Sequence, residues 1–197
     1  MSDLSRRHFV EQLGALSAVW LLALSTERES GTHDHAHRTS QPPRLRFFDR
    51  AQAAEIEAAA ERIVPSDDGP GAREANAVYF IDGGLATFAK DQQKLFVDGL
   101  RALASAARER YPQAERFSAL SAAQQDEVLR AIEKTPFFEA LRGATIAGMF
   151  ALPSYGGNRD YVGWTAVGMS TDPVFAPPFG HYDQPAVRRK LLGRSDP

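Results

Sequence analysis

Apolar residues recur three and four positions apart in several segments between residues 47 and 153, a spacing typical of amphipathic α-helices. No segment alternates apolar and polar residues for long enough to indicate a sheet. Pro65, Pro112 and Pro153 mark the ends of periodic segments, because proline lacks the backbone N–H that a helix interior needs. The sequence therefore predicts a mainly α fold: a small, bundle-like helical domain of about five helices, with an irregular C-terminal third.

Residue chemistry at the helix ends refines this prediction. Asp49 and Ser121 are typical N-cap residues, and Gln124 completes a capping box with Ser121. Pro136 takes the first helical position after Thr135. The expected helices cover residues 50–64, 74–85, 91–110, 122–132 and 136–152. Their expected buried faces hold Ile56, Ala60, Ile63, Phe96, Leu100, Leu103, Ala107, Val128, Leu129, Ile132, Phe137, Leu141, Thr145 and Gly148.

The N-terminal residues have the pattern of an export signal. Arg6 and Arg7 are followed by Phe9 and by a weakly apolar run over residues 13–24, which is the pattern of a twin-arginine leader. The run is shorter than the roughly 20 residues that a membrane-spanning helix needs. The alternative is a chance arginine pair beside an ordinary secretory or anchoring helix. We expect a signal peptide over residues 1–25, a flexible polar linker over 26–46 and one domain over 47–197.

The linker contains three alternating histidines, His33, His35 and His37. On an extended backbone their imidazoles would share one side, as in a divalent-metal site. A mobile linker supplies no neighbouring groups to orient metal ligands, so we favour a solvated histidine-rich linker.

Composition limits the chemistry open to this chain. The formal net charge of −2 gives no electrostatic reason to expect nucleic acid as a partner. There is no cysteine, which excludes disulfides, thiolate nucleophiles and cysteine-held zinc or iron–sulfur clusters. Dinucleotide-binding, phosphate-loop, zinc-protease and serine-hydrolase motifs are missing from the sequence. We therefore expect no catalytic, cofactor-binding or metal-binding residue in this chain.

Two weaker catalytic patterns are present in the sequence. Asp67 and Asp68 are adjacent carboxylates, but in a turn rich in glycine and proline such residues more often cap helices or bind backbone N–H groups. Ser154, His181 and Asp183 supply the residue types of a nucleophilic triad, although nothing in the sequence brings them together.

The densest polar and aromatic cluster lies in residues 153–164. Aromatic side chains together with arginine are the usual anchors of protein interfaces. The alternative is a rigid internal loop whose aromatic residues complete the core, and the two interpretations are compatible. The residues expected at a partner interface are Asp67, Asp68 and Pro70 of the first loop, and Tyr155, Asn158, Arg159, Asp160, Tyr161 and Trp164 of the second.

Three stretches resemble the gluconate 2-dehydrogenase subunit 3 family. They are residues 60–72 (AERIVPSDDGPGA) with 79–82 (YFID), residues 117–120 (FSAL) with Gln124, Gln125 and Leu129, and residues 155–160 (YGGNRD) with Gly163, Trp164 and Gly168. The resemblance covers roughly residues 47 to 170, and the twin-arginine pattern agrees with it.

The resemblance implies a non-catalytic small (gamma) subunit of a membrane-associated dehydrogenase for sugars, sugar acids or glycosides. In this family a large subunit carries FAD, and an iron–sulfur cluster or haem c on partner subunits, such as a cytochrome c, takes the electrons. The small subunit often bears the export signal, so the twin-arginine translocase would carry the folded complex to the periplasm, where it attaches to the outer face of the inner membrane. The alternative is a free-standing periplasmic enzyme or small-ligand-binding protein that uses Asp67, Asp68, Arg159, Asp160 or His181.

Overall fold

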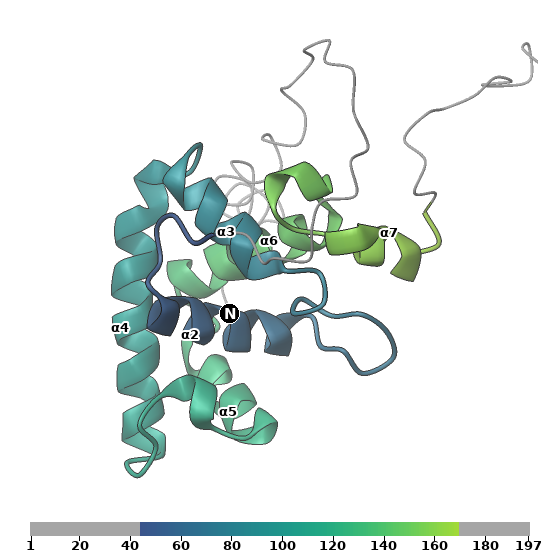
Figure 1. Cartoon of the computed structure of the whole chain (residues 1–197). Helices are drawn as coiled ribbons and strands as arrows, with labels where there is room; N and C mark the ends of the chain where they lie inside the picture. Colours follow the sequence, from purple (N-terminus) through teal and green to yellow (C-terminus); the bar gives the residue numbers. More distant parts are fainter. Residues whose placement is uncertain (1–43, 170–197) are drawn as a thin grey trace, which may run out of the picture.

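The computed structural model describes residues 44–169, which form six α-helices and no strand (Figure 1). The α-helices are α2 (Arg50–Ile63), α3 (Ala77–Ala86), α4 (Gln93–Arg110), α5 (Ala122–Ile132), α6 (Pro136–Phe150) and α7 (Val162–Ala166). Short 3₁₀ turns cover Lys90–Gln92, Phe117–Ala119, Pro153–Tyr155 and Arg159–Tyr161. The leader, the histidine tract, His181 and Asp183 lie outside the described residues. Within 44–169, no helix is both long and apolar enough to cross a bilayer.

The helices pack around one main core. The longest helix, α4, forms one side of the molecule, and α2, α5 and α6 pack against it (Figure 1). The apolar helix α3 lies between α2 and α6, and α7 packs on α6. The expected mainly helical fold is confirmed, and a short sixth helix, α7, occupies part of the segment expected to be irregular.

Phenylalanine and alanine dominate the core. Phe48, Phe80, Phe96, Phe117 and Phe137 are buried, and the rings of Phe96 and Phe137 meet edge to face with centroids 5.7 Å apart. Burial of each such ring contributes about 1.5–3 kcal/mol. The residues predicted to be buried are buried, except Ile63, which is half-buried at the end of α2.

The predicted helix starts are also confirmed. Asp49 caps α2 by accepting from the backbone N–H of Gln52, and Ser121 caps α5 by accepting from that of Gln124. In both cases the side-chain oxygen of the glutamine accepts a hydrogen bond from the backbone N–H of the cap residue, which completes a capping box. Thr135 caps α6 in front of a proline in its first turn. Each cap contributes about 1 kcal/mol.

The predicted start of the second helix is wrong. The helix begins at Ala77 instead of residue 74, because Asn76 adopts a left-handed conformation (φ 57°) and the chain before it forms turns. Glu74 lies in these turns and accepts a hydrogen bond from the backbone N–H of Gly71, 2.9 Å away. The third helix begins two residues later than predicted, after the turn at Lys90–Gln92.

A buried carboxylate fixes the chain where it enters the domain. Asp82 on α3 is 1% exposed and accepts three backbone hydrogen bonds, from Arg46 (2.6 Å), Phe47 (3.0 Å) and Phe48 (2.8 Å). Three donors directed at one carboxylate compensate for its removal from water. The segment immediately before α2 is therefore held against α3.

Candidate partner-binding site

The fold brings the two loops that the sequence singled out side by side. The backbone N–H of Arg159 in the second loop donates to the carbonyl of Ala75, 3.1 Å away, at the end of the first. Beneath this contact lies a small apolar cluster separate from the main core, formed by Ala60, Ala72, Ala75, Ala77 and Met149, with Val64 and Val162 packed against it. Residues about 90 positions apart in the chain thus form one surface.

Carboxylates hold the first loop in shape. The hydroxyl of Ser66 lies 2.8 Å from Glu61 Oε1 and 2.6 Å from Glu74 Oε2. The other oxygen of Glu61 accepts from the backbone N–H of Arg73 at 3.2 Å. The hydrogen bond from Ser66 is the main cause of a lowered pKa of Glu74. These bonds leave the tip of the loop, which includes Asp67 and Asp68, exposed to solvent, whereas Pro70 is half-buried.

The second loop has an unusual backbone. Asn158, Asp160 and Tyr161 all have positive φ angles (43°, 52° and 58°), which residues other than glycine rarely adopt. Gly156 (φ 97°) begins this stretch. Such conformations cost of order 1–3 kcal/mol each and persist only where the surrounding structure enforces them; they are often found at functional sites.

Asn158 enforces this conformation from inside the protein. Its side chain is fully buried, donates from Nδ2 to the carbonyl of Ala151 (3.0 Å) and accepts at Oδ1 from the N–H of Gly163 (2.9 Å). Its own N–H donates to the carbonyl of Gly148 at 2.8 Å. The Asn158 side chain is therefore enclosed by its own chain, and its expected contact with a partner stays a prediction. It organises the loop that carries its neighbours.

Trp164 is also mainly an internal residue. It is 7% exposed, its Nε1 donates to the carbonyl of Phe150 (2.8 Å), and its ring lies 5.0 Å from that of Tyr161. Gly163 makes this packing possible, because a Cβ there would lie 1.9 Å from the carbonyl oxygen of Met149. The internal-scaffold interpretation therefore applies to Trp164 and Asn158.

Other residues of the second loop face solvent. Arg159 and Asp160 are exposed and form an ion pair (Nε to Oδ2, 3.3 Å), and Tyr155 and Tyr161 are half-buried. A surface pair of this kind adds little to stability, so both groups can exchange partners at low cost. Their contact with another chain stays a prediction.

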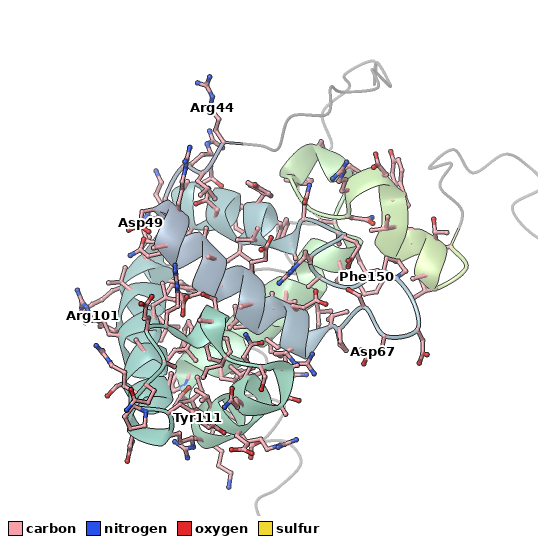
Figure 2. The ribbon with its side chains drawn as sticks, turned by 60° about the horizontal axis from the view of Figure 1, so that its bottom comes forward. Arg44, Asp49, Asp67, Arg101, Tyr111 and Phe150 are labelled. Atoms are coloured by element: carbon pink, nitrogen blue, oxygen red, sulfur yellow. The ribbon has the colours of Figure 1, made fainter. Side chains whose placement is uncertain are left out.

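Exposed apolar side chains adjoin this loop and define what we call the α6–α7 face. It consists of Ile146, Phe150, Leu152, Val167 and Met169, which are 37–61% exposed. Ile146 and Phe150 are one turn apart on α6, and the bond from Trp164 to Phe150 places α7 beside them. Figure 2 shows Asp67 of the first loop and Phe150 on the same side of the molecule, opposite Arg101. Grouped exposed apolar residues commonly mark a protein interface.

The structure places some of the residues of the weaker catalytic patterns and leaves others outside the described range. Within 44–169 no three His, Asp or Glu side chains are grouped as metal ligands. Ser154 is exposed, while His181 and Asp183 of the proposed triad lie outside the described residues. Asp67, Asp68, Arg159 and Asp160 are all exposed, whereas perturbed catalytic groups are usually found in clefts.

Several important residues were not found from the sequence. Asp82 had a signal, since it is the one charged residue in an otherwise apolar helix. Glu61 and Ser66 had none, because their partners are identified only by the folded loop. Arg62 forms a bidentate ion pair with Asp126 (2.7 and 3.2 Å), which joins α2 to α5 and raises the pKa of Arg62. The two residues are too far apart in the sequence for local patterns to predict this pair.

The described residues form a small all-helical domain in which the two signature loops lie side by side, next to exposed apolar residues. The chain belongs to the gluconate 2-dehydrogenase subunit 3 family, whose model matches residues 50–170. The family is that of an accessory subunit of a dehydrogenase complex. No curated protein and no solved structure shows a significant match to the chain.

Proposed function

We propose that this chain is the non-catalytic small subunit of a periplasmic, FAD-dependent dehydrogenase complex that acts on sugars, sugar acids or glycosides. It supports the folding of the flavin-bearing large subunit and carries it across the membrane by the twin-arginine route. Flavin and any haem c or iron–sulfur group lie on partner subunits, one of which is a cytochrome c.

The observation that carries this proposal is the α6–α7 face beside the two signature loops. An accessory subunit must present a surface to its partner, and this surface combines exposed Phe150 and Leu152 with the guanidinium of Arg159. Such a combination is enriched at interfaces. Asn158 keeps the loop in one conformation, so little conformational entropy is lost when a partner binds.

The sequence supports the export part of the proposal. Arg6 and Arg7 form the address that the translocase reads, and this route accepts folded proteins, so a large subunit without a leader can travel bound to this chain. Membership of the family agrees with such a role.

Replacement of Arg6 and Arg7 by lysine tests the export proposal. Lysine keeps the charge and removes only the feature that the translocase recognises. With a flavin-bearing large subunit co-expressed, we expect the double variant to leave both subunits in the cytoplasm, still bound to each other, with at least a tenfold loss of periplasmic flavoprotein by immunoblot. Unchanged periplasmic flavoprotein would contradict the proposal.

A further inference from the structure

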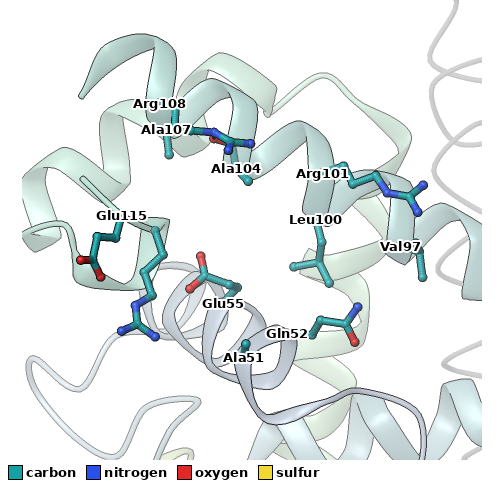
Figure 3. A pocket seen from close by; sticks show the side chains of 11 residues that line it. Ala51, Gln52, Glu55, Val97, Leu100, Arg101, Ala104, Ala107, Arg108 and Glu115 are labelled. Carbon is teal, nitrogen blue, oxygen red and sulfur yellow. The ribbon is translucent and has the colours of Figure 1, made fainter. Parts of the chain in front are cut away.

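A hollow lies between α2 and α4, away from the signature loops (Figure 3). It has a volume of about 380 Å³. Its apolar lining comes from Ala51 on α2 and from Val97, Leu100, Ala104 and Ala107 on α4. We call it the α2–α4 groove. None of the residues predicted for a partner interface lines it.

Charged side chains, more of them basic than acidic, line the groove together with its apolar residues. Arg101, Arg108 and Arg116 line it together with Glu55 and Glu115. Figure 3 shows the Glu55 carboxylate pointing from α2 into the space, and this carboxylate accepts hydrogen bonds from the backbone and hydroxyl of Ser118. The lining holds three arginines and two carboxylates, and Arg101 also pairs with Asp98 (2.8 Å), so Arg108 and Arg116 are the basic groups that an acidic flank would meet. The groove therefore suits an apolar segment with acidic flanks.

We propose that the α2–α4 groove shelters the apolar run at residues 13–24 of this chain before export. The run carries Leu13, Leu16, Trp20 and Leu24 at the spacing of one helix face. Glu11 precedes it, and Glu27 and Glu29 follow it with Arg28 between them, so each flank carries acidic residues. This inference rests on the proposed export function, because it assigns a role to the leader.

The dimensions of the run and the groove agree. As a helix, residues 13–24 would extend about 17 Å at about 1.5 Å per residue, the same length as the stretch of α4 from Val97 to Arg108. The small side chains of Ala51, Ala104 and Ala107 allow close approach of another helix.

The connection along the chain favours this occupant over a separate protein. The described chain begins at Arg44, and Ala51 and Gln52 in the first turn of α2 already line the groove. If residues 25–43 behave as a flexible chain, as the sequence predicts for the linker, their root-mean-square span would be about 24 Å. A tether of this length gives the run an effective concentration in the millimolar range near the groove. Docking would hide the apolar run and leave Arg6 and Arg7, which precede it, for the translocase to read.

Disulfide cross-linking in the full-length, unprocessed chain tests this inference. The natural sequence has no cysteine, so introduced cysteines are the only thiols. Ala104→Cys in the groove is combined with Leu16→Cys or with Trp20→Cys, which covers both directions of the docked run. A disulfide forms only where the two Cα atoms come within about 7 Å. Ala102→Cys, at an exposed position of the same helix, is the matched control.

We expect at least one Ala104→Cys pair to give an intramolecular cross-link on mild oxidation, in about tenfold higher yield than the matching Ala102→Cys pair. Equal yields at the two positions, or no cross-link, would overturn the inference. A cross-linked dimer would also overturn it, by showing that the leader of a second copy fills the groove. The assay uses this chain alone, so its failure leaves the partner-binding proposal standing, and loss of partner binding would not affect the cross-link.

Discussion

Replacing Asn158 with alanine should strongly destabilise the protein. The change removes both side-chain hydrogen bonds and leaves the carbonyl of Ala151 and the N–H of Gly163 without them in a buried setting. Each such loss costs about 1–3 kcal/mol. Alanine must also adopt the left-handed conformation that asparagine tolerates better, at a cost of about 1 kcal/mol. The expected decrease in the free energy of unfolding is therefore about 3–7 kcal/mol.

Urea unfolding of the full-length chain, followed by circular dichroism, measures this decrease. Arg159→Ala is the matched control, because its side chain is 58% exposed and substitutions at such positions usually change stability by about 0.5 kcal/mol or less. Asn158→Gly should recover about 1 kcal/mol relative to alanine, since glycine accepts positive φ. If Asn158→Ala and Arg159→Ala unfold with the same free energy, Asn158 does not organise the loop.

Three further predictions concern single side chains. Asp82→Asn should lower the free energy of unfolding by about 2 kcal/mol and allow trypsin to cleave after Arg46, because an amide accepts fewer hydrogen bonds from backbone N–H groups than a carboxylate does. The same substitution at the exposed Asp91 should have neither effect. Ser66→Ala should destabilise the protein at neutral pH, because it removes the hydrogen bond that lowers the pKa of Glu74. A carboxylate with a lowered pKa stabilises the fold only while it is ionised, so the difference in the free energy of unfolding between Ser66→Ala and wild type should shrink as the pH falls below about 4.5. Arg159→Ala should weaken co-purification with the large subunit while leaving the unfolding midpoint nearly unchanged.

Local features of the structure could be predicted from the sequence, and long-range ones could not. The caps at Asp49 and Ser121 involve residues three positions apart, so their residue types suffice. Glu74 was placed in a helix because local periodicity does not reveal its bond to Ser66 in the folded loop.

The same limit applied to the candidate site. Its exposed members, such as Asp67 and Arg159, were recognised from residue chemistry and family resemblance. The burial of Asn158 could not be predicted, because an asparagine in a loop gives no sign that it will be buried. No sequence pattern predicts the α2–α4 groove, since it depends on how two helices separated by about 30 residues pack together.

The central claim is that the α6–α7 face binds the large subunit. Phe150 and Phe88 are equally exposed (38%), but Phe150 lies on this face and Phe88 follows the opposite end of α3 from the first loop. The direct measurement is the amount of co-expressed flavoprotein that co-purifies with each variant, per molecule of the small chain. We predict that Phe150→Glu reduces this ratio at least tenfold, whereas Phe88→Glu leaves it within twofold of wild type. Equal retention by both variants, with both chains folded, would contradict the claim.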